Sequence, residues 1–357
     1  MDLYTAAIIQ PIQRNISHRV EIKSVLTRYL KLIDFITSEG VQANKEFAPV
    51  KLVTFPEFFL QGLDRHWGLK RILEDIAISI PGEETAILAN KAKQYKIYIA
   101  GAALEVDSEW KDRFFNTAFI IDPDGRVIHK YRKFAPATYV GELALSPHDM
   151  YDEYVARYGE SLNTFFPVTD TLIGKIGTMI CMDSNFPEIS RALAINGAEI
   201  IIRPTSYHAP LISSPLNYWE LQNRTRAWEN LVYMIAPNTG IFIDTPFPEL
   251  WAPGHSMIVS YDGSILAEIP HPGEGVVSGV INLDILRKRR KDVNRNLLAQ
   301  LRTEVFKLIY KDPVYPKNRC LKEPYRDIED IAERGSLTPI IEEFFKKGIY
   351  TKPKFKD

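Results

Sequence analysis

Apolar segments of strand length alternate along the chain with segments whose apolar residues recur every three or four positions. In the first half, YTAAIIQP, VKLVTFPE and IYIAGAALE have the composition of strands, and residues 19–38 and 84–95 have the periodicity of helices. In the second half, IGTMIC, AEIIIRPT and LVYMIAPNTG predict strands, and residues 187–196 and 216–231 predict helices. This order is typical of an α/β sandwich.

Two further segments, NTAFIIDPDGRVIHKY and GHSMIVSYDGSILAEI, predict β-hairpins, because Asp-Gly lies between alternating apolar residues. The sheets are therefore expected to be mixed, and the two similar halves predict two layers of sheet covered by helices. The segments from Phe134 to Phe165 and from Ile241 to His255 predict long loops near a site.

The composition changes near residue 286, where the charge run RKRRKDVNRN begins. Such a run predicts a solvated face rather than a nucleic-acid contact. The remaining chain is rich in aromatic side chains, which we expect to pack on a neighbouring subunit. We therefore predict a domain over 1–285 and an oligomerisation arm over 286–357, in at least a homodimer. The aromatic residues are Phe306, Tyr310, Tyr315, Phe344, Phe345 and Tyr350.

The overall composition is that of an ordinary globular protein, with 357 residues, 45% hydrophobic and 25% charged. Lys and Arg number 44 against 45 Asp and Glu, so no net charge favours nucleic acid or an anionic membrane as a partner. The two cysteines form no CxxC pair, which excludes a disulfide scaffold and a cysteine-based zinc site. Without a leader pattern or a long apolar segment, we expect a cytoplasmic protein that acts on a small molecule.

Cys181 ends the apolar segment KIGTMIC and precedes a predicted helix. A thiol at the carboxyl end of a strand, facing a helix N-terminus, is expected to favour the thiolate form. The alternative is an inert, buried cysteine. Ser184 or Asn185 as a cap, Pro187 in the first turn and Gly197 as a stop specify the turn locally, which favours a nucleophile.

Glu57 ends the strand KLVTFPEFF, at the sheet edge where active sites of open α/β folds collect. A half-buried carboxylate there is a candidate proton acceptor, although end-of-strand acids are often caps or ion-pair partners. Lys133 follows the first hairpin and is a candidate to stabilise a thiolate and an oxyanion. The alternative is a surface lysine in a cluster with Lys130 and Arg132.

Taken together, these segments resemble the nitrilase superfamily of carbon-nitrogen hydrolases over residues 4–285. The resemblance rests on FPEFF, DGRVIHKYRK, GTMICMDSNFPEISRALAINGAEIII, RTRAWENLVYMIAPNTG and GHSMIVSYDGSILAE. It implies an α-β-β-α sandwich, a catalytic triad of Glu57, Lys133 and Cys181, and the family's face-to-face dimer. It also implies a second carboxylate, Glu142 in ATYVGELAL.

Within the superfamily, true nitrilases usually have Cys-Trp-Glu where this chain has Cys181, Met182 and Asp183. This difference favours amides over nitriles as substrates. Arg203 and Tyr207 in GAEIIIRPTSYHAP are similar to the aliphatic amidase and formamidase branch. N-carbamoyl amino acid amidohydrolases and nitrilases remain alternatives, as do acyl transfer and a non-catalytic scaffold.

The resemblance implies hydrolysis of a small amide through a thioester on Cys181, with release of ammonia and a carboxylic acid. Glu57 would take the thiol proton, and Lys133 and the backbone N–H of Met182 would hold the oxyanion. Glu142 would position the amide nitrogen or the attacking water. Phe58, Tyr139, Met182 and Tyr207 adjoin these positions in sequence and are predicted to line the pocket, with ordinary packing as the alternative.

No cofactor and no metal are predicted. His148, Asp149, Asp152 and Glu153 cluster in the sequence, but they lack a helical H-x-x-x-H spacing. No G-x-S-x-G motif occurs. Trp219 and Trp228 are assigned to the core or a subunit interface, and Cys320 to a passive role.

Overall fold

The computed structural model describes residues 2–38, 48–207, 217–243 and 254–354, and these contain two six-stranded mixed sheets. The first sheet has the order β14-β1-β3-β4-β5-β6, in which β1, β3 and β4 are parallel and the others antiparallel to their neighbours. Its strands are β1 (Leu3–Gln10), β3 (Val50–Glu57), β4 (Tyr98–Val106), β5 (Phe114–Ile121), β6 (Val127–Arg132) and β14 (Gly275–Asn282).

The second sheet has the order β13-β12-β10-β9-β8-β7, with β8, β9 and β10 parallel. Its strands are β7 (Val168–Thr171), β8 (Gly174–Thr178), β9 (Ile200–Ile202), β10 (Tyr233–Ala236), β12 (Met257–Val259) and β13 (Ile265–Glu268). A separate parallel pair joins β2 (Gln13–Arg14) to β11 (Phe242–Ile243). Both predicted Asp-Gly hairpins are present, as β5–β6 and β12–β13.

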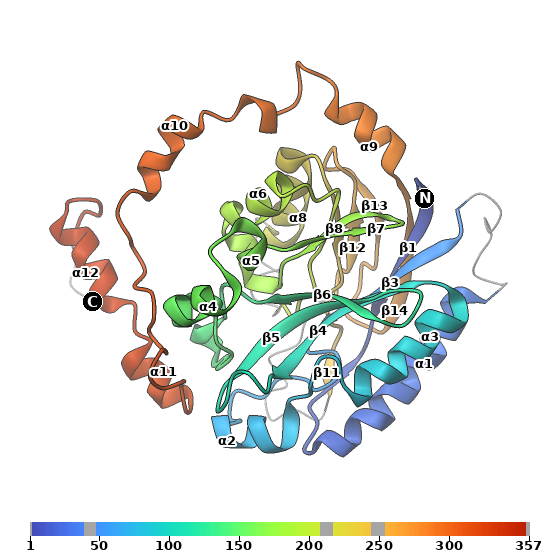
Figure 1. The fold of residues 1–357 in the computed structure, drawn as a ribbon, viewed down its shortest axis with the longest axis horizontal. Coiled ribbons are helices and arrows are strands. Elements are labelled where there is room, and N and C mark those ends of the chain that lie inside the picture. Colours follow the sequence, from blue (N-terminus) through green and yellow to red (C-terminus); the bar gives the residue numbers. More distant parts are fainter. Residues whose placement is uncertain (1, 39–47, 208–216, 244–253, 355–357) are drawn as a thin grey trace.

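Helices cover the outer face of each sheet (Figure 1). The helices α1 (Ile22–Thr37) and α3 (Glu83–Tyr95) pack on the first sheet, and α6 (Pro187–Ile195) and α8 (Tyr218–Asn230) on the second. Because side chains of a strand alternate between its faces, Tyr4, Ala6 and Ile8 of β1 pack against the second sheet, while Ala7 and Ile9 pack toward α1 and α3. The predicted α-β-β-α sandwich with mixed sheets is confirmed.

The four predicted helices are present, with ends shifted by at most three residues, but the predicted loop from Phe134 to Phe165 is wrong. It contains the short helical turns η3 (Thr138–Val140) and η4 (Pro147–Met150) and the helices α4 (Tyr151–Tyr158) and α5 (Leu162–Phe165). The sequence indicates α4 only weakly, because the helix is eight residues long and its apolar face consists mostly of tyrosines, of which only Tyr154 is buried. Most of the second predicted loop, residues 244–253, lies outside the described residues.

The local prediction around the cysteine is also partly wrong. The strand predicted to reach Cys181 ends at Thr178, and the N-cap of α6 is Phe186, not Ser184 or Asn185. The turn η5 (Cys181–Asn185) intervenes. The side chains of Ser184 and Asn185, which were expected to cap α6, are instead hydrogen-bonded to Gln222 of α8. Pro187 does begin the helix.

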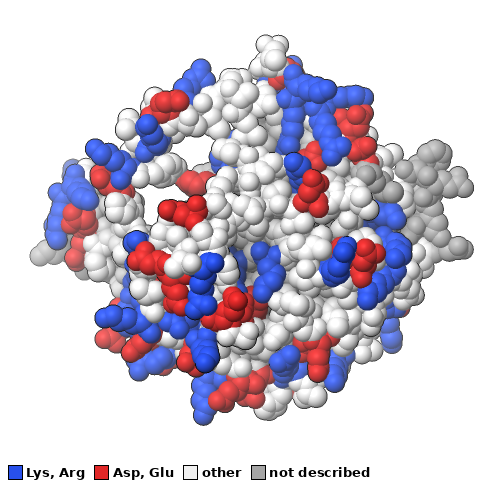
Figure 2. All heavy atoms as spheres, in the orientation of Figure 1, with Lys and Arg blue, Asp and Glu red and all other residues white. Residues whose placement is uncertain are grey.

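The helix α9 (Leu283–Arg290) spans the predicted boundary between domain and arm. Leu283 and Leu286 are buried in the core between the sheets, Arg287 forms an ion pair with Glu199, and Arg290 donates to the carbonyl of Leu231. The start of the charge run is therefore attached to the main body. Figure 2 shows Lys and Arg gathered over α9, whereas both signs of charge are interspersed on the rest of that face.

Beyond α9 the chain forms an arc beside the body (Figure 1). Phe306, Tyr310 and Tyr350 are exposed in the single chain, whereas Cys320 and Tyr325 are buried against the body. The elements of the arc are η6 (Leu298–Gln300), α10 (Thr303–Phe306), η7 (Lys307–Tyr310), α11 (Ile328–Arg334) and α12 (Thr338–Lys346). The body also contains the short elements η1 (Arg19–Glu21), α2 (Leu69–Arg71) and η2 (Ile72–Ile76). Among the described residues, no helix combines the length and the apolar character needed to cross a membrane.

Candidate active site

Two buried carboxylates share one ammonium group at the edge of the first sheet. Glu57 is the last residue of β3, and Lys133 follows β6 directly. The Lys133 Nζ lies 2.7 Å from Glu57 Oε1 and 2.7 Å from Glu142 Oε2. All three side chains are almost fully buried, so Lys133 is not the surface lysine of the alternative interpretation.

Further donors hold the carboxylates in place. Asn116 of β5 donates from Nδ2 to Glu57 Oε1 at 2.7 Å and to Glu142 Oε1 at 2.8 Å. The backbone N–H of Ser206 donates to Glu57 Oε2 at 2.9 Å, and that of Ala137 to Glu142 Oε2 at 2.7 Å. Asn116 is not among the predicted site residues, although an asparagine inside the apolar segment FFNTAFII is a signal, because a buried amide needs partners.

Cys181 lies just beyond β8 of the second sheet and opens η5 with a positive φ of 45°. Its N–H donates to the carbonyl of Pro204, and its own carbonyl accepts from Arg203 Nε at 3.2 Å and Nη2 at 3.1 Å. Within the described part of the chain, the next N–H, that of Met182, has no hydrogen-bond acceptor. Such a free donor beside the thiol is suited to bind an oxyanion.

Asp183 ties this turn to the first sheet. Its carboxylate accepts from the N–H of Ile180, from the N–H of Ala135 at 2.8 Å and from the hydroxyl of Tyr131 at 2.7 Å. Tyr131 and Ala135 flank Lys133, so the cysteine and the lysine are held together through Asp183. Burial raises the pKa of Asp183 to about 6.

The electrostatics of the site contradict the predicted resting thiolate. Burial raises the pKa of the Cys181 thiol, and the charge of Glu57 raises it further, while Lys133 and Arg203 oppose the shift only in part. The physical reason is the burial of the thiol, which also opens a short turn and does not lie at the N-terminus of α6. The resting site therefore holds a neutral thiol and needs a base to activate it.

The pKa values of Glu57 and Lys133 are both raised, for different reasons. Burial raises the pKa of Glu57, Glu142 raises it further, and Lys133 opposes the shift. The pKa of Lys133 stays well above its usual range, because the two carboxylates outweigh the effect of burial. The geometry thus provides a permanent cation beside a carboxylate that accepts a proton more readily than usual.

All the predicted site residues line one cavity of about 20 Å³, which combines side chains from both sheets. Phe58 and Tyr207 are buried in its wall, whereas Tyr139 is 64% exposed. Burial raises the pKa of both tyrosines, so both hydroxyls are neutral at pH 7. The lining residues are Glu57, Phe58, Leu63, Lys133, Ala137, Tyr139, Glu142, Cys181, Met182, Asn185, Ser206 and Tyr207.

Residues 5–291 match the family model described as carbon-nitrogen hydrolase. The chain belongs to the carbon-nitrogen hydrolase family. It is 27% identical over 342 residues to a formamidase of Bacillus cereus, which covers 94% of this chain and 89% of that protein, and 26% identical over the same length to a formamidase of Bacillus thuringiensis. These findings confirm the predicted nitrilase superfamily and the predicted enzyme class.

Solved structures of carbon-nitrogen hydrolases share the fold. Nit3 of Saccharomyces cerevisiae, from branch 10 of the nitrilase superfamily, is 25% identical with a TM-score of 0.63, covering 82% of this chain and 94% of that one. A carbon-nitrogen hydrolase of Helicobacter pylori is 20% identical with a TM-score of 0.66, covering 87% and 99%. An amidase of Nesterenkonia sp. is 18% identical with a TM-score of 0.62, covering 85% and 96%, and its active-site cysteine carries the acetamide moiety of fluoroacetamide.

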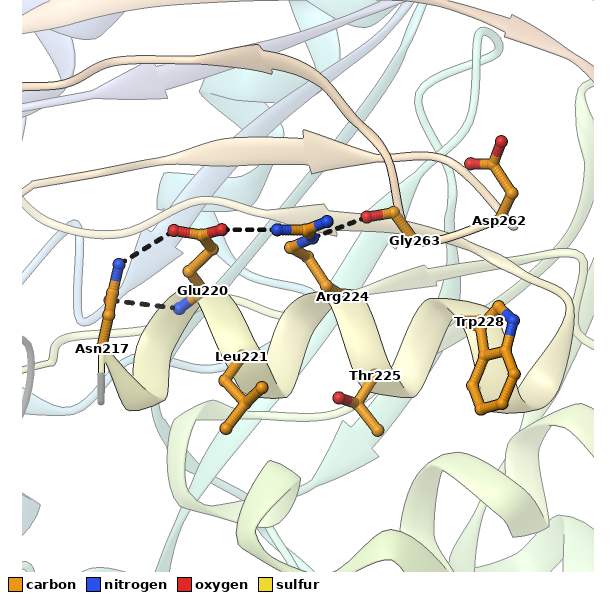
Figure 3. Close-up of a pocket in the computed structure, with 8 residues that line it drawn as sticks. All are labelled: Asn217, Glu220, Leu221, Arg224, Thr225, Trp228, Asp262 and Gly263. Atoms are coloured by element: carbon orange, nitrogen blue, oxygen red, sulfur yellow. Dashed lines mark hydrogen bonds and ion pairs between the residues drawn. The ribbon is translucent and has the colours of Figure 1, made fainter.

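A larger cavity of this carbon-nitrogen hydrolase, about 460 Å³, lies on the outer face of α8 (Figure 3). Arg224 forms an ion pair with Glu220 and donates to the carbonyl of Gly263, whereas Asp262 accepts from Ser264. Trp228 lines it and is 52% exposed, whereas Trp219 is buried beside Tyr207. Trp219 therefore belongs to the core and Trp228 to the surface.

The histidine and acidic residues that cluster in the sequence do not converge on a common point. Asp149 accepts from the N–H of Ser146, Asp152 pairs with Lys317, and Glu153 pairs with Arg157. Among the residues that the structure describes, no group of three His, Cys, Asp or Glu side chains is arranged to hold a metal.

Proposed function

We propose that this protein hydrolyses a small, unsubstituted carboxamide to ammonia and a carboxylic acid through a thioester on Cys181. The observation that carries the proposal is the convergence of Cys181 with the buried Glu57–Lys133–Glu142 network on one cavity of about 20 Å³. The similarity to formamidases of Bacillus species supports the same class of substrate.

In the first half of the reaction, Glu57 takes the proton of the Cys181 thiol as the sulfur attacks the amide carbonyl carbon. The raised pKa of Glu57 favours this transfer, because its carboxylate binds a proton more readily than an exposed one. The oxyanion that forms accepts from the Lys133 ammonium and the free N–H of Met182. The C–N bond then breaks, Glu57 returns the proton to the departing nitrogen, and ammonia leaves a thioester behind.

In the second half, Glu57 removes a proton from a water molecule, which attacks the thioester carbonyl. The same donors stabilise the second oxyanion. The C–S bond breaks, the sulfur recovers its proton from Glu57, and the carboxylic acid leaves. Glu142 is hydrogen-bonded through one oxygen to Lys133 and Ala137, which leaves its other oxygen, shared with Asn116, to orient an amide N–H or the water.

The size and charge of the cavity favour a small amide over the alternatives. One water molecule needs roughly 10–15 Å³ on the same measure, so the cavity suits a ligand of few heavy atoms. An N-carbamoyl amino acid would bring a further carboxylate, which needs a cation. Among the described lining residues the only cation is Lys133, and it already pairs with two carboxylates.

The test is ammonia release by the wild type, Cys181→Ala and Cys320→Ala. The panel contains formamide, acetamide, propionamide, an aromatic amide, N-carbamoyl amino acids and the matching nitriles. We expect activity on the shortest amides, its loss in Cys181→Ala and its retention in Cys320→Ala, the matched control for the other cysteine. Full activity of Cys181→Ala would contradict the mechanism, and activity confined to carbamoyl compounds or nitriles would contradict the substrate. Hydroxamate formation in added hydroxylamine would report the thioester and its capacity for acyl transfer.

A further inference from the structure

Asn116 is fully buried on β5, and its amide group lies between the two carboxylates of the site. Both N–H bonds of its single NH₂ group are used, one toward Glu57 Oε1 at 2.7 Å and one toward Glu142 Oε1 at 2.8 Å. Its Oδ1 has no hydrogen-bond partner among the described residues. The geometry of the amide is thus set by the carboxylates.

The pattern of donors fixes where protons can reside. The NH₂ group of Asn116 and the ammonium of Lys133 only donate, so each oxygen that faces them must present a lone pair. Glu57 Oε1 accepts from both groups and has no lone pair left for a proton. Among the residues that the structure describes, Glu57 Oε2 accepts only from the N–H of Ser206, which leaves one lone pair free.

The free oxygen of Glu57 also faces the second sheet, which carries the nucleophile. Ser206 belongs to the segment after β9, and Pro204 of that segment accepts the N–H of Cys181. The oxygen blocked by Asn116 and Lys133 is the one turned toward the first sheet. The hydrogen bonds therefore leave the free lone pair on the oxygen that contacts the segment bonded to the backbone of Cys181.

We propose that Asn116 is a positioning residue that directs the proton taken from Cys181 to Glu57 Oε2 and holds Glu142 Oε1 as a hydrogen-bond acceptor. The proposal rests on the proposed function, in which Glu57 exchanges protons with the thiol. A neutral amide suits the task, because it separates two like charges without adding a charge of its own. It acts through Glu57 and Glu142 and needs no contact with the substrate.

Two substitutions remove the donors to different degrees. Asn116→Asp keeps the shape but places a third acid beside one ammonium, so the pKa of the acid group should rise. We expect kcat to fall roughly tenfold to a hundredfold, the acid limb of the kcat pH profile to move up by about one pH unit, and KM to change less than about threefold. Asn116→Ser is smaller and keeps one donor, so its kcat and its shift should lie between those of the wild type and Asn116→Asp.

The experiment measures kcat and KM from pH 5 to 9 on the amide that the wild type hydrolyses best. The rate of Cys181 alkylation by iodoacetamide over the same range reports thiol deprotonation without turnover. Thr117→Val is the matched control, because Thr117 is the next residue of β5, is equally buried and donates to Glu105 instead. Its pH profiles should coincide with those of the wild type.

A shifted acid limb in the Asn116 variants and an unshifted one in Thr117→Val would support the role. A folded Asn116→Asp protein with wild-type kcat and pH profile would overturn it, as would an equal shift in Thr117→Val. If Asn116→Asp does not fold, Asn116→Ser decides in the same way. If the wild type lacks Cys181-dependent hydrolysis, the proposed function fails by itself, and the alkylation profiles still test whether Asn116 sets the deprotonation of the thiol.

Discussion

At the scale of single residues, Asp149 is a buried carboxylate outside the catalytic cavity. It lies on η4, where its Oδ2 accepts from the N–H of Ser146 at 3.2 Å and its Oδ1 has no partner among the described residues. Burial raises its pKa from 3.8 to about 6, a shift that Ser146 and Arg319 oppose only in part. A raised pKa means that the folded state favours the protonated acid, so its contribution to stability is complete below pH 4 and is lost as the pH rises through 6.

We predict that Asp149→Asn is more stable than the wild type at pH 7.5 and no more stable at pH 4. The gain at pH 7.5 should approach roughly 3 kcal/mol, since two pKa units correspond to about 2.7 kcal/mol. Urea unfolding at the two pH values measures it. Asp183, whose pKa is also raised to about 6, affects both proteins equally. An equal difference between variant and wild type at both pH values would contradict the assignment.

At the scale of elements, the nucleophile is held by contacts among β9, η5 and α8. Arg203 follows β9, donates twice to the carbonyl of Cys181 and reaches Asn223 of α8 at 2.7 Å. Its guanidinium lies over the ring of Trp219 and also donates to Gln222 of α8 at 3.0 Å. Burial lowers its pKa to about 10, so it remains charged at neutral pH.

We predict that Arg203→Lys lowers kcat roughly tenfold or more, because a lysine cannot reproduce the planar, forked set of donors that fixes the carbonyl of Cys181. The matched control is Arg226→Lys. Arg226 also donates twice to a backbone carbonyl of η5, that of Ser184, at 3.2 and 3.0 Å. Turnover of the preferred amide and the alkylation rate of Cys181 are the measurements. Equal losses in both variants would assign the effect to η5 in general rather than to the carbonyl of the nucleophile.

The sequence predicted the elements better than their contacts. Periodicity identified α1, α3, α6 and α8, because each has an apolar face long enough to stand out from the surrounding chain. It missed α4, a helix of eight residues whose apolar face consists mostly of tyrosines. The turn that carries the nucleophile was predicted, but the predicted cap and the predicted thiolate are wrong. The turn η5 and the burial of the thiol arise only from the packing of the two sheets.

The same distinction applies to the site. Glu57, Lys133, Glu142 and Cys181 were selected from motifs and strand ends, and the structure brings them to one cavity. Asn116 was not selected, because its hydrogen bonds reach residues 59 and 26 positions away. Contacts of this kind depend on the pairing of β3, β4 and β5, which no local pattern specifies.

At the scale of the whole molecule, the arm consists of two parts with different environments. Residues near Cys320 pack on the body, where the N–H of Cys320 donates to the carbonyl of Asp149 and Arg113 donates to the carbonyl of Leu321. Ile328 lies against Gly141, the neighbour of Glu142. This part of the arm supports the loop that carries the second carboxylate. The part around α10 and η7 exposes apolar side chains instead.

We predict that the protein is at least a dimer and that the segment around η7 contributes to the subunit contact. Leu308 and Ile309 are 63% and 68% exposed in the single chain, and adjacent exposed apolar side chains mark interaction surfaces. The double substitution Leu308→Glu with Ile309→Glu should therefore reduce the molar mass measured by sedimentation velocity. Val20→Glu is the control, because Val20 is similarly exposed, at 71%, but lies on the turn η1 of the body. A monomeric wild type, or the same mass in all three proteins, would contradict the prediction and assign the exposed segment a role within one chain. Retained amide hydrolysis in the double variant would show that catalysis does not depend on assembly.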